Sequence, residues 1–171
     1  VMDLISEENP SDNIKPVNKV YSKDDVLAEV YMTEAKYNRL LNVLKRKKNI
    51  ILQGAPGVGK TFAAKRLAYA MMGEKDNERI EFIQFHQNYS YEDFIMGYKP
   101  TENGGFAMQY GVFYRFCKKA ENNPEKDYFF IIDEINRGNM SKIFGELLLL
   151  IEKDYRGTSS KLAYQNLNFS V

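Results

Sequence analysis

Residues 49–61 read Asn-Ile-Ile-Leu-Gln-Gly-Ala-Pro-Gly-Val-Gly-Lys-Thr. The apolar run at residues 50–52 predicts a short buried strand, and the glycines after it predict a loop that ends where Lys60 and Thr61 open a helix. The G-x-x-x-x-G-K-[ST] pattern binds phosphate in this strand–loop–helix setting. Glycine lets backbone N–H groups turn toward phosphate oxygens, and the helix N-terminus adds partial positive charge. The stretch therefore predicts a nucleoside triphosphate site.

The side chains of this loop have separate expected roles. Lys60 is expected to reach the β- and γ-phosphates, and the Thr61 hydroxyl is expected to bind Mg²⁺. The alternative is a chance glycine-rich turn, a pattern that arises in roughly one chain in a hundred of this length. The flanking strand and helix make that alternative weaker still. The expected nucleotide-binding segment comprises Gly54, Ala55, Pro56, Gly57, Val58, Gly59, Lys60, Thr61 and Phe62.

A second motif follows about 70 residues downstream. Residues 128–132 are all apolar or aromatic and predict a fully buried strand that runs into Asp133 and Glu134. Asp133 is expected to hold Mg²⁺, and Glu134, with Lys60 the expected catalytic pair, to orient and deprotonate the attacking water. Two acids after a strand are often only solvated charges, but the phosphate loop upstream favours the catalytic interpretation.

Composition limits the other classes of function. The 171 residues are 44% hydrophobic and 27% charged, which suits a soluble globular domain, and the net charge of +1 gives no global case for nucleic-acid or membrane binding. No apolar run approaches the roughly 20 residues of a membrane span, and no signal-peptide pattern opens the chain. The single cysteine, Cys117, fits a reducing cytoplasm, and the single histidine, His86, argues against a zinc site.

The N-terminal third divides into an arm and two helices. Residues 1–20 are polar and lack periodicity, which predicts a flexible arm or linker ahead of a domain spanning residues 21–171. Ser22 with Asp25 resembles a capping box and predicts a helix over residues 23–30. Thr33 predicts the N-cap of an amphipathic helix, which the basic run at residues 45–48 closes. Those cations complement the helix dipole, and contact with DNA is the alternative.

The remaining elements alternate in type. The helix after the loop should stop near Gly73. The further elements predicted are a strand over residues 79–86, an aromatic-rich loop with a short helix over 87–100, a small hairpin through 106–110, a helix over 112–120 with Cys117 packed, a helix buried on several sides over 141–152, and a hairpin over 161–171. In the 87–100 loop, the aromatic side chains are expected to pack against the domain, with base stacking as the alternative.

The phosphate loop together with Asp133 and Glu134 resembles the AAA+ superfamily of ring-forming NTPases. The finer similarity, over about residues 21–171, is to McrB-like GTPase subunits of McrBC-type modification-dependent restriction systems. The run at residues 132–136 is also similar to MoxR-type AAA+ proteins. The stretches that carry the similarity are residues 85–95, Phe-His-Gln-Asn-Tyr-Ser-Tyr-Glu-Asp-Phe-Ile; residues 97–100, Gly-Tyr-Lys-Pro; residues 111–114, Gly-Val-Phe-Tyr; and residues 132–147, from Ile-Asp-Glu-Ile-Asn-Arg to Phe-Gly-Glu-Leu.

This resemblance implies an α/β P-loop NTPase fold, the AAA+ three-layer sandwich with a mainly parallel sheet. It also implies a hexameric ring that works with an McrC-like nuclease on methylated DNA, read by a domain outside this chain. Asn136 and Arg137 match the family run, and a contact to a neighbouring active site is set against a plain surface ion pair.

The resemblance also shows departures. Family members continue through a strand carrying Met-Asn-x-x-Asp-Arg-Ser, later arginines and a helical lid, all absent before Val171. That strand lies between the phosphate-loop strand and the Asp133 strand, so the chain is expected to be a truncated domain with a gap in its sheet and weak turnover on its own.

The base and the biological role stay open. The Asn-Lys-x-Asp motif of Ras-like GTPases is absent; the McrB resemblance implies GTP, and AAA+ membership in general implies ATP. Tyr31 and Met32 are candidates for the base pocket. A MoxR-type ATPase that remodels protein partners and a module that only binds nucleotide are the alternatives to a restriction motor.

Overall fold

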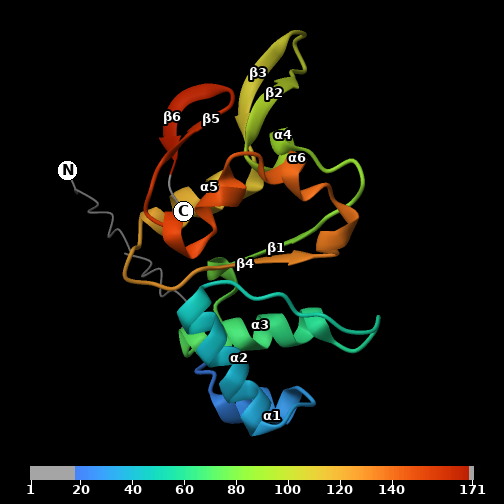
Figure 1. Cartoon of the computed structure of the whole chain (residues 1–171), viewed down its shortest axis with the longest axis vertical. Coiled ribbons are helices and arrows are strands. Elements are labelled where there is room, and N and C mark those ends of the chain that lie inside the picture. Colours follow the sequence, from blue (N-terminus) through green and yellow to red (C-terminus); the bar gives the residue numbers. More distant parts are fainter. Residues whose placement is uncertain (1–17, 170–171) are drawn as a thin grey trace, which may run out of the picture.

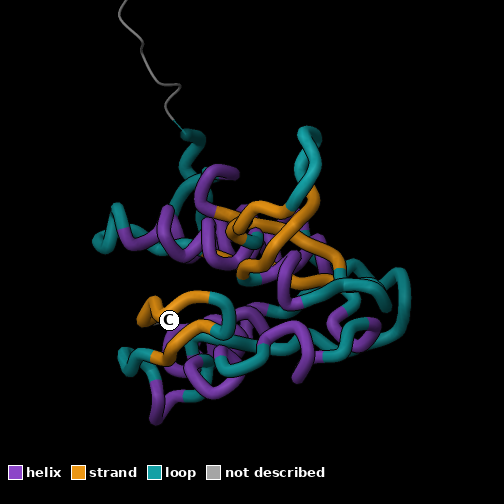
Figure 2. The backbone as a smooth tube through the Cα atoms, turned by 90° about the horizontal axis from the view of Figure 1, so that it is seen from above, coloured by secondary structure: helices purple, strands orange, loops and turns teal. Residues whose placement is uncertain are grey.

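The computed structural model describes residues 18–169 and divides into a helical part and a mixed α/β part (Figure 1). The helical part contains α1 (Lys23–Glu29), α2 (Glu34–Lys47) and α3 (Lys60–Met72). Figure 1 places these helices below β1 (Ile80–Gln84) and β4 (Phe129–Asp133), and the remaining helices and hairpins above them. Helices and loops make up the greater part of the outline when the molecule is seen from above (Figure 2).

Local capping signals set the first helices as predicted. The Ser22 hydroxyl accepts from the Asp25 amide while the Asp25 carboxylate accepts from the Ser22 amide, a complete capping box for α1. Thr33 caps α2 by accepting from the Lys36 amide. Most of the predicted arm, residues 1–17, lies outside the described part, and Val20 forms a β-bridge with Glu74.

Helix α3 follows the phosphate loop, as the motif predicts. It begins at Lys60 and ends at Met72, and the cap residue Gly73 has a φ of 76°, the left-handed conformation that glycine adopts at helix ends. Leu67 and Ala68 are buried on its inner side, so α3 is held firmly against the rest of the helical part.

Strands β1 and β4 pair in parallel, in a register that runs from Ile80 opposite Phe129 to Gln84 opposite Asp133. Every residue of β4 is half-buried, so the prediction of a fully buried strand is wrong. Among the described residues β4 has one neighbouring strand, which leaves its other edge without a partner. A strand buried on both sides needs neighbours at both edges as well as cover on both faces.

Residues 50–52 do not form the predicted buried strand. Ile51 is 79% exposed, and Ile50 packs against the helical part. No strand among the described residues pairs with this run. An apolar run becomes a strand only where another strand offers its backbone groups, and here that partner is lacking.

Two hairpins complete the α/β part. Strands β2 (Met96–Pro100) and β3 (Phe106–Tyr110) pair in antiparallel fashion and confirm the predicted hairpin, with Gly104 and Gly105 at positive φ in its turn. The prediction of loop and short helix as far as residue 100 is wrong from Met96 onward, because β3 offers this segment a paired strand. Strands β5 (Ser160–Leu162) and β6 (Gln165–Phe169) form the second predicted hairpin. The remaining elements are α4 (Tyr91–Phe94), α5 (Val112–Glu121), and the 3₁₀ turns η1 (Asn77–Arg79), η2 (Ile135–Arg137) and η3 (Lys153–Tyr155).

The single helix predicted over residues 141–152 is two short helices, α6 (Met140–Phe144) and α7 (Leu147–Leu150). The chain breaks at Gly145, which has φ 51° and ψ −130°. A Cβ at this glycine would lie 3.0 Å from the Tyr91 ring, and the Tyr91 hydroxyl donates a 2.6 Å hydrogen bond to Glu146 Oε1. Apolar periodicity does not reveal this packing, which is why the prediction of one helix is wrong.

Two hydrophobic clusters stabilise the molecule. The upper cluster is aromatic-rich and centres on Phe94, which is fully buried among the rings of Phe85, Phe113, Phe130 and Phe144. The lower cluster joins α1, α2 and α3 and is smaller; its buried members are Tyr21, Val26, Tyr37, Leu67 and Tyr69. No helix within residues 18–169 is long and apolar enough to span a membrane.

Candidate nucleotide site

The two sequence motifs meet at the carboxyl end of β4. Thr61, in the first turn of α3, donates a hydrogen bond of 3.0 Å from Oγ1 to Oδ2 of Asp133, although the two residues are 72 positions apart. Both side chains are partly buried. Ligands of parallel α/β proteins bind at this end of the strands, so the contact lies where a nucleotide site is expected.

The phosphate loop curls around its own lysine. Lys60 Nζ donates to the carbonyl oxygens of Gly54 at 3.0 Å and Ala55 at 2.8 Å. Gly57 and Gly59 have φ of 76° and 77°, a backbone conformation that L side chains rarely adopt. Gly59 is also the N-cap of α3 and supplies no capping side chain, so the first amides of the helix have no side-chain acceptor. Such amides are suited to binding an anion.

Asp133 uses both carboxylate oxygens. Oδ2 accepts from Thr61, and Oδ1 accepts from the backbone amide of Glu134 at 3.0 Å. These two hydrogen bonds fix the carboxylate at the strand end. The carboxylate and the Thr61 hydroxyl together offer two oxygen ligands, the kind of donor that Mg²⁺ prefers.

The donor set fits Mg²⁺ bound together with phosphate. No group of three or more His, Cys, Asp or Glu side chains suited to a metal occurs within residues 18–169. Mg²⁺ commonly takes one or two protein ligands and completes its octahedron with phosphate oxygens and water. Thr61 and Asp133 match that pattern, whereas a structural zinc or calcium site would need more protein ligands.

Glu134 has an unusual backbone conformation. Its φ of 50° and ψ of 39° place it in the left-handed region, which costs a residue with a Cβ about 1–2 kcal/mol. Its side chain is 35% exposed, and Oε2 accepts from Arg137 Nε at 3.0 Å. The carboxylate can therefore meet solvent water. The sequence left a plain surface ion pair open as one alternative for Arg137 without naming its partner, and the structure shows that this partner is Glu134.

A polar depression of about 460 Å³ adjoins this region and is lined by His86, Gln87, Asn88 and Arg137. The ring of His86 packs edge-on against Tyr89, with centroids 5.3 Å apart. Three of the lining residues follow β1 in the chain, and the fourth, Arg137, belongs to the turn that follows Glu134. Sequence reasoning singled out His86 and Arg137 individually but did not predict that they share one wall.

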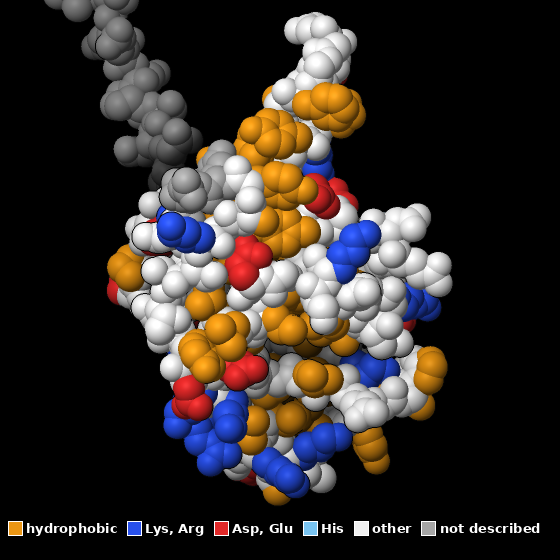
Figure 3. All heavy atoms as spheres, turned by 45° about the horizontal axis from the view of Figure 1, so that its top comes forward, with side chains coloured by type: hydrophobic (Ala, Val, Ile, Leu, Met, Phe, Trp, Pro, Cys, Tyr) orange, Lys and Arg blue, Asp and Glu red, His pale blue; other side chains and the backbone are white. Residues whose placement is uncertain are grey.

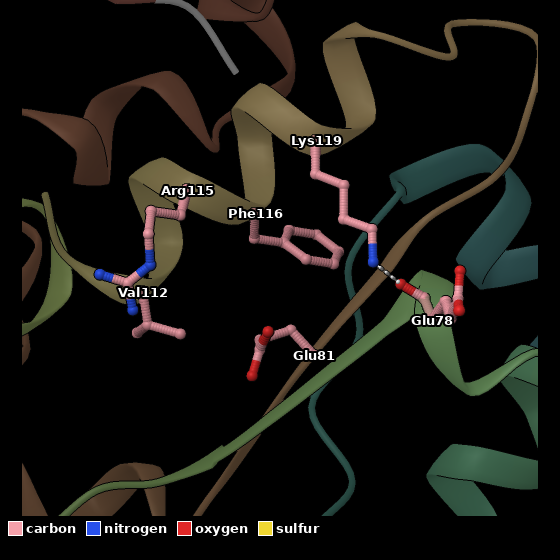
Figure 4. Close-up of a pocket in the computed structure, with 6 residues that line it drawn as sticks. All are labelled: Glu78, Glu81, Val112, Arg115, Phe116 and Lys119. Carbon is pink, nitrogen blue, oxygen red and sulfur yellow. Dashed lines mark hydrogen bonds between the residues drawn. The ribbon is translucent and has the colours of Figure 1, made fainter.

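A second hollow, of about 180 Å³, lies between α5 and the start of β1 (Figure 4). Lys119 reaches across it and donates from Nζ to the Glu78 carbonyl oxygen at 2.6 Å. Its position near the amino ends of the strands separates it from the Thr61–Asp133 contact at their carboxyl ends. The sequence had assigned no ligand-binding or catalytic role to its lining residues: Glu78, Glu81, Val112, Arg115, Phe116 and Lys119.

The remaining residues named from the sequence lie in exposed, half-buried and buried environments. Val58 and Phe62 are exposed, and the Arg66 guanidinium lies 3.4 Å from the Phe62 ring centroid. Tyr31 is fully exposed, and Met32 packs against the lower cluster, so the structure gives no enclosed pocket for a base at these two residues. Burial raises the pKa of the Cys117 thiol to about 12, as expected of a packed and unreactive cysteine.

A family profile described as AAA domain (dynein-related subfamily) matches residues 49–169, from the phosphate loop to the last hairpin. The chain is also similar to the type IV methyl-directed restriction enzyme EcoKMcrB subunit of Escherichia coli, at 54% identity over 147 residues. A second relative is the type II restriction enzyme BsuMI component YdiS of Bacillus subtilis, at 29% identity over 138 residues.

These alignments cover unequal shares of the proteins that they join. The first covers 84% of this chain and 32% of the Escherichia coli protein. The second covers 66% of this chain and 40% of the Bacillus subtilis protein. The chain thus spans about a third of the length of one relative and two fifths of the other.

Proposed function

This chain belongs to the AAA domain family, dynein-related subfamily, and on that premise we propose that it binds and hydrolyses a nucleoside triphosphate with the help of Mg²⁺. The observation that carries the proposal is the 3.0 Å hydrogen bond between Thr61 and Asp133. It joins two motifs far apart in sequence at one point, and each supplies one oxygen ligand of the expected kind.

Binding uses the loop and its lysine. The amides of the loop and of the first turn of α3 donate to phosphate oxygens, while Lys60 exchanges its two carbonyl acceptors for the β- and γ-phosphates. Exchanging neutral acceptors for charged ones strengthens each hydrogen bond, so the lysine gains by the change.

Hydrolysis depends on the acids after β4. Thr61 and Asp133 would hold Mg²⁺, which when bound neutralises charge on the phosphates. Glu134, next to Asp133 and open to solvent, orients the attacking water and accepts its proton. The ion pair with Arg137 keeps the Glu134 carboxylate at this edge of the sheet.

We further propose that the nucleotide is GTP and that the chain is part of a ring-forming motor in a DNA restriction complex with an McrC-like nuclease. The base choice rests on the McrB-like stretches at residues 85–95 and 132–147. The biological role is supported by the two relatives, since both are named as components of restriction enzymes.

The test is Glu134→Gln in the whole protein. Turnover should fall by about 10² or more, because the amide cannot accept the proton of the attacking water. Nucleotide affinity should persist, and competition between GTP and ATP should favour GTP in both proteins. Glu125→Gln is the matched control, since Glu125 is an exposed glutamate that precedes the amino end of β4, whereas Glu134 follows its carboxyl end.

Two results would contradict the proposal. Undiminished turnover in Glu134→Gln would remove Glu134 from the reaction. Preference for ATP would keep the hydrolase and overturn the GTP assignment.

A further inference from the structure

We propose that one face of α2 contacts the phosphate backbone of duplex DNA. The face carries four cations, Lys36, Arg39, Arg46 and Lys47, which we call the cationic stripe. Lys and Arg side chains gather toward the lower end of the surface in Figure 3, the end at which Figure 1 places α1 to α3.

The four side chains share one side of the helix. At 100° per residue they fall within a sector of roughly 100°, offset from the side that carries buried Tyr37. From Lys36 to Lys47 the stripe is roughly 16 Å long at 1.5 Å per residue. One strand of B-DNA presents a phosphate about every 3.4 Å along its axis, so the stripe can face about five phosphates.

These charges have no partners among the described residues. All four side chains are exposed, and no ion pair within residues 18–169 includes any of them. The acidic residue of α2, Glu34, is already bound to Lys23 at 2.8 Å. The stripe thus presents like charges that repel one another, and an anionic partner would relieve this repulsion.

The helix dipole explains only part of the stripe. Arg46 and Lys47 lie in the last turn, where cations are favourable. Lys36 lies in the first turn, where the dipole disfavours a cation, and Arg39 lies one turn further along. The dipole therefore favours the second half of the stripe and does not account for the first.

The composition of the stripe favours phosphate over a protein partner. Cores of protein interfaces are enriched in aromatic residues and arginine and depleted of lysine, so the lysines of the stripe and any aromatic neighbours are what distinguish the two kinds of partner. The side chain between the two halves of the stripe, Val43, is small and half-buried, so the stripe has no aromatic anchor. Asn42, at the edge of the stripe, is exposed and adds an amide that can donate to phosphate. A row of cations with amide side chains is the usual composition of a sequence-independent DNA contact.

This inference goes beyond the proposed hydrolysis, because the stripe includes no residue of the phosphate loop or of the acids after β4. The net charge of +1 does not argue against DNA binding by the stripe, because acidic residues elsewhere in the chain balance the local cluster of cations in the total. The two proposals can therefore fail separately.

The experiment measures binding of the whole protein to a 30-base-pair duplex without modified bases, between 50 and 200 mM NaCl. In the variant Lys36→Gln/Arg39→Gln/Arg46→Gln/Lys47→Gln, the slope of log K against log [salt] should become shallower by about 3–4, at 0.9 per lost phosphate contact. Turnover of nucleotide without DNA should be unchanged. The matched control removes four exposed lysines elsewhere: Lys126→Gln/Lys142→Gln/Lys153→Gln/Lys161→Gln.

An equal slope in the stripe variant, the control and the unaltered protein overturns the proposal. Unchanged DNA binding with loss of affinity for a polyaspartate peptide would also overturn it, and would assign the stripe to an acidic protein. If the fourfold variant does not fold, as judged by circular dichroism, the pairs Lys36→Gln/Arg39→Gln and Arg46→Gln/Lys47→Gln replace it. Each pair should then lower the slope by about 2.

Discussion

Two apolar runs in this molecule look alike in sequence and differ in structure. Residues 129–132 pair with β1 along their whole length, whereas residues 50–52 pair with no described strand and leave Ile51 exposed. Both runs are short and apolar, and each leads into one of the two sequence motifs of the candidate site. The difference lies in their surroundings: β1 offers β4 a row of backbone donors and acceptors, and no such row adjoins residues 50–52.

The phosphate loop is anchored at its C-terminal end, where it leads into α3, and not at its N-terminal end. The loop has no paired strand behind it, but α3 after it is anchored by Leu67 in the lower cluster and by the Thr61–Asp133 hydrogen bond. The chain therefore positions the loop through a helix and one polar contact. An additional strand beside residues 50–52 would add support at the N-terminal end.

The largest contrast is expected in stability. Phe94→Ala should lower the free energy of unfolding by about 3–5 kcal/mol, because it opens a cavity among four aromatic rings. Ile51→Ala, at a side chain that is 79% exposed, should change it by about 0.5 kcal/mol or less. Urea unfolding of the 171-residue chain measures both values. A large loss in Ile51→Ala would show that residues 50–52 do pack as a strand.

The anchor of the loop should give a smaller effect. Thr61→Val removes the hydroxyl that donates to Asp133. The free energy of unfolding should fall by about 1–3 kcal/mol, because the partly buried Asp133 carboxylate loses a hydrogen-bond partner. Nucleotide affinity should fall when Mg²⁺ is present and change little after EDTA removes the metal, because only the first condition uses the hydroxyl as a ligand. Equal losses in both conditions would argue against Thr61 as a metal ligand.

The smallest expected effect is the loss of stability at acidic pH through Glu29. The Arg66 and Lys75 side chains that bind Glu29 lower the pKa of this carboxyl below its usual 4.5 and join α1 to α3. The folded state therefore binds this proton less readily than the unfolded state, and the contribution to stability, complete above pH 4.5, is lost as the pH falls below that value. The NMR signal of the Arg66 Nε–H, which donates to Glu29 Oε2, should shift in this range of pH, and an equal shift in Glu29→Gln would contradict the assignment.

The sequence allowed prediction of those elements that depend on local signals. Ser22, Thr33 and Gly73 set helix ends by contacts within a few residues, and the turn signal at residues 103–105 ahead of residues 106–110 was enough to place a hairpin. The break at Gly145 could not be predicted, because its cause is the ring of Tyr91, far away in sequence. The missing pairing of residues 50–52 likewise depends on a neighbour and not on the run itself.

For the candidate site, the spacing of the motifs predicted which residues would gather, and Thr61 and Asp133 are in contact. The ion pair of Glu134 with Arg137 and the wall that Arg137 shares with His86 depend on the path of the chain after β4. Side-chain chemistry alone does not determine that path. The assigned roles of these residues remain predictions for the experiments above.

The left-handed backbone of Glu134 has a consequence for selection. Glycine would adopt φ 50° without the steric penalty of about 1–2 kcal/mol, but Glu134→Gly would also lose the ion pair with Arg137 and give the unfolded chain more conformational freedom. A laboratory screen for heat resistance alone would therefore exert little selection for glutamate at this position. Selection for nucleotide hydrolysis would retain it only if the proposed role of its carboxylate is correct.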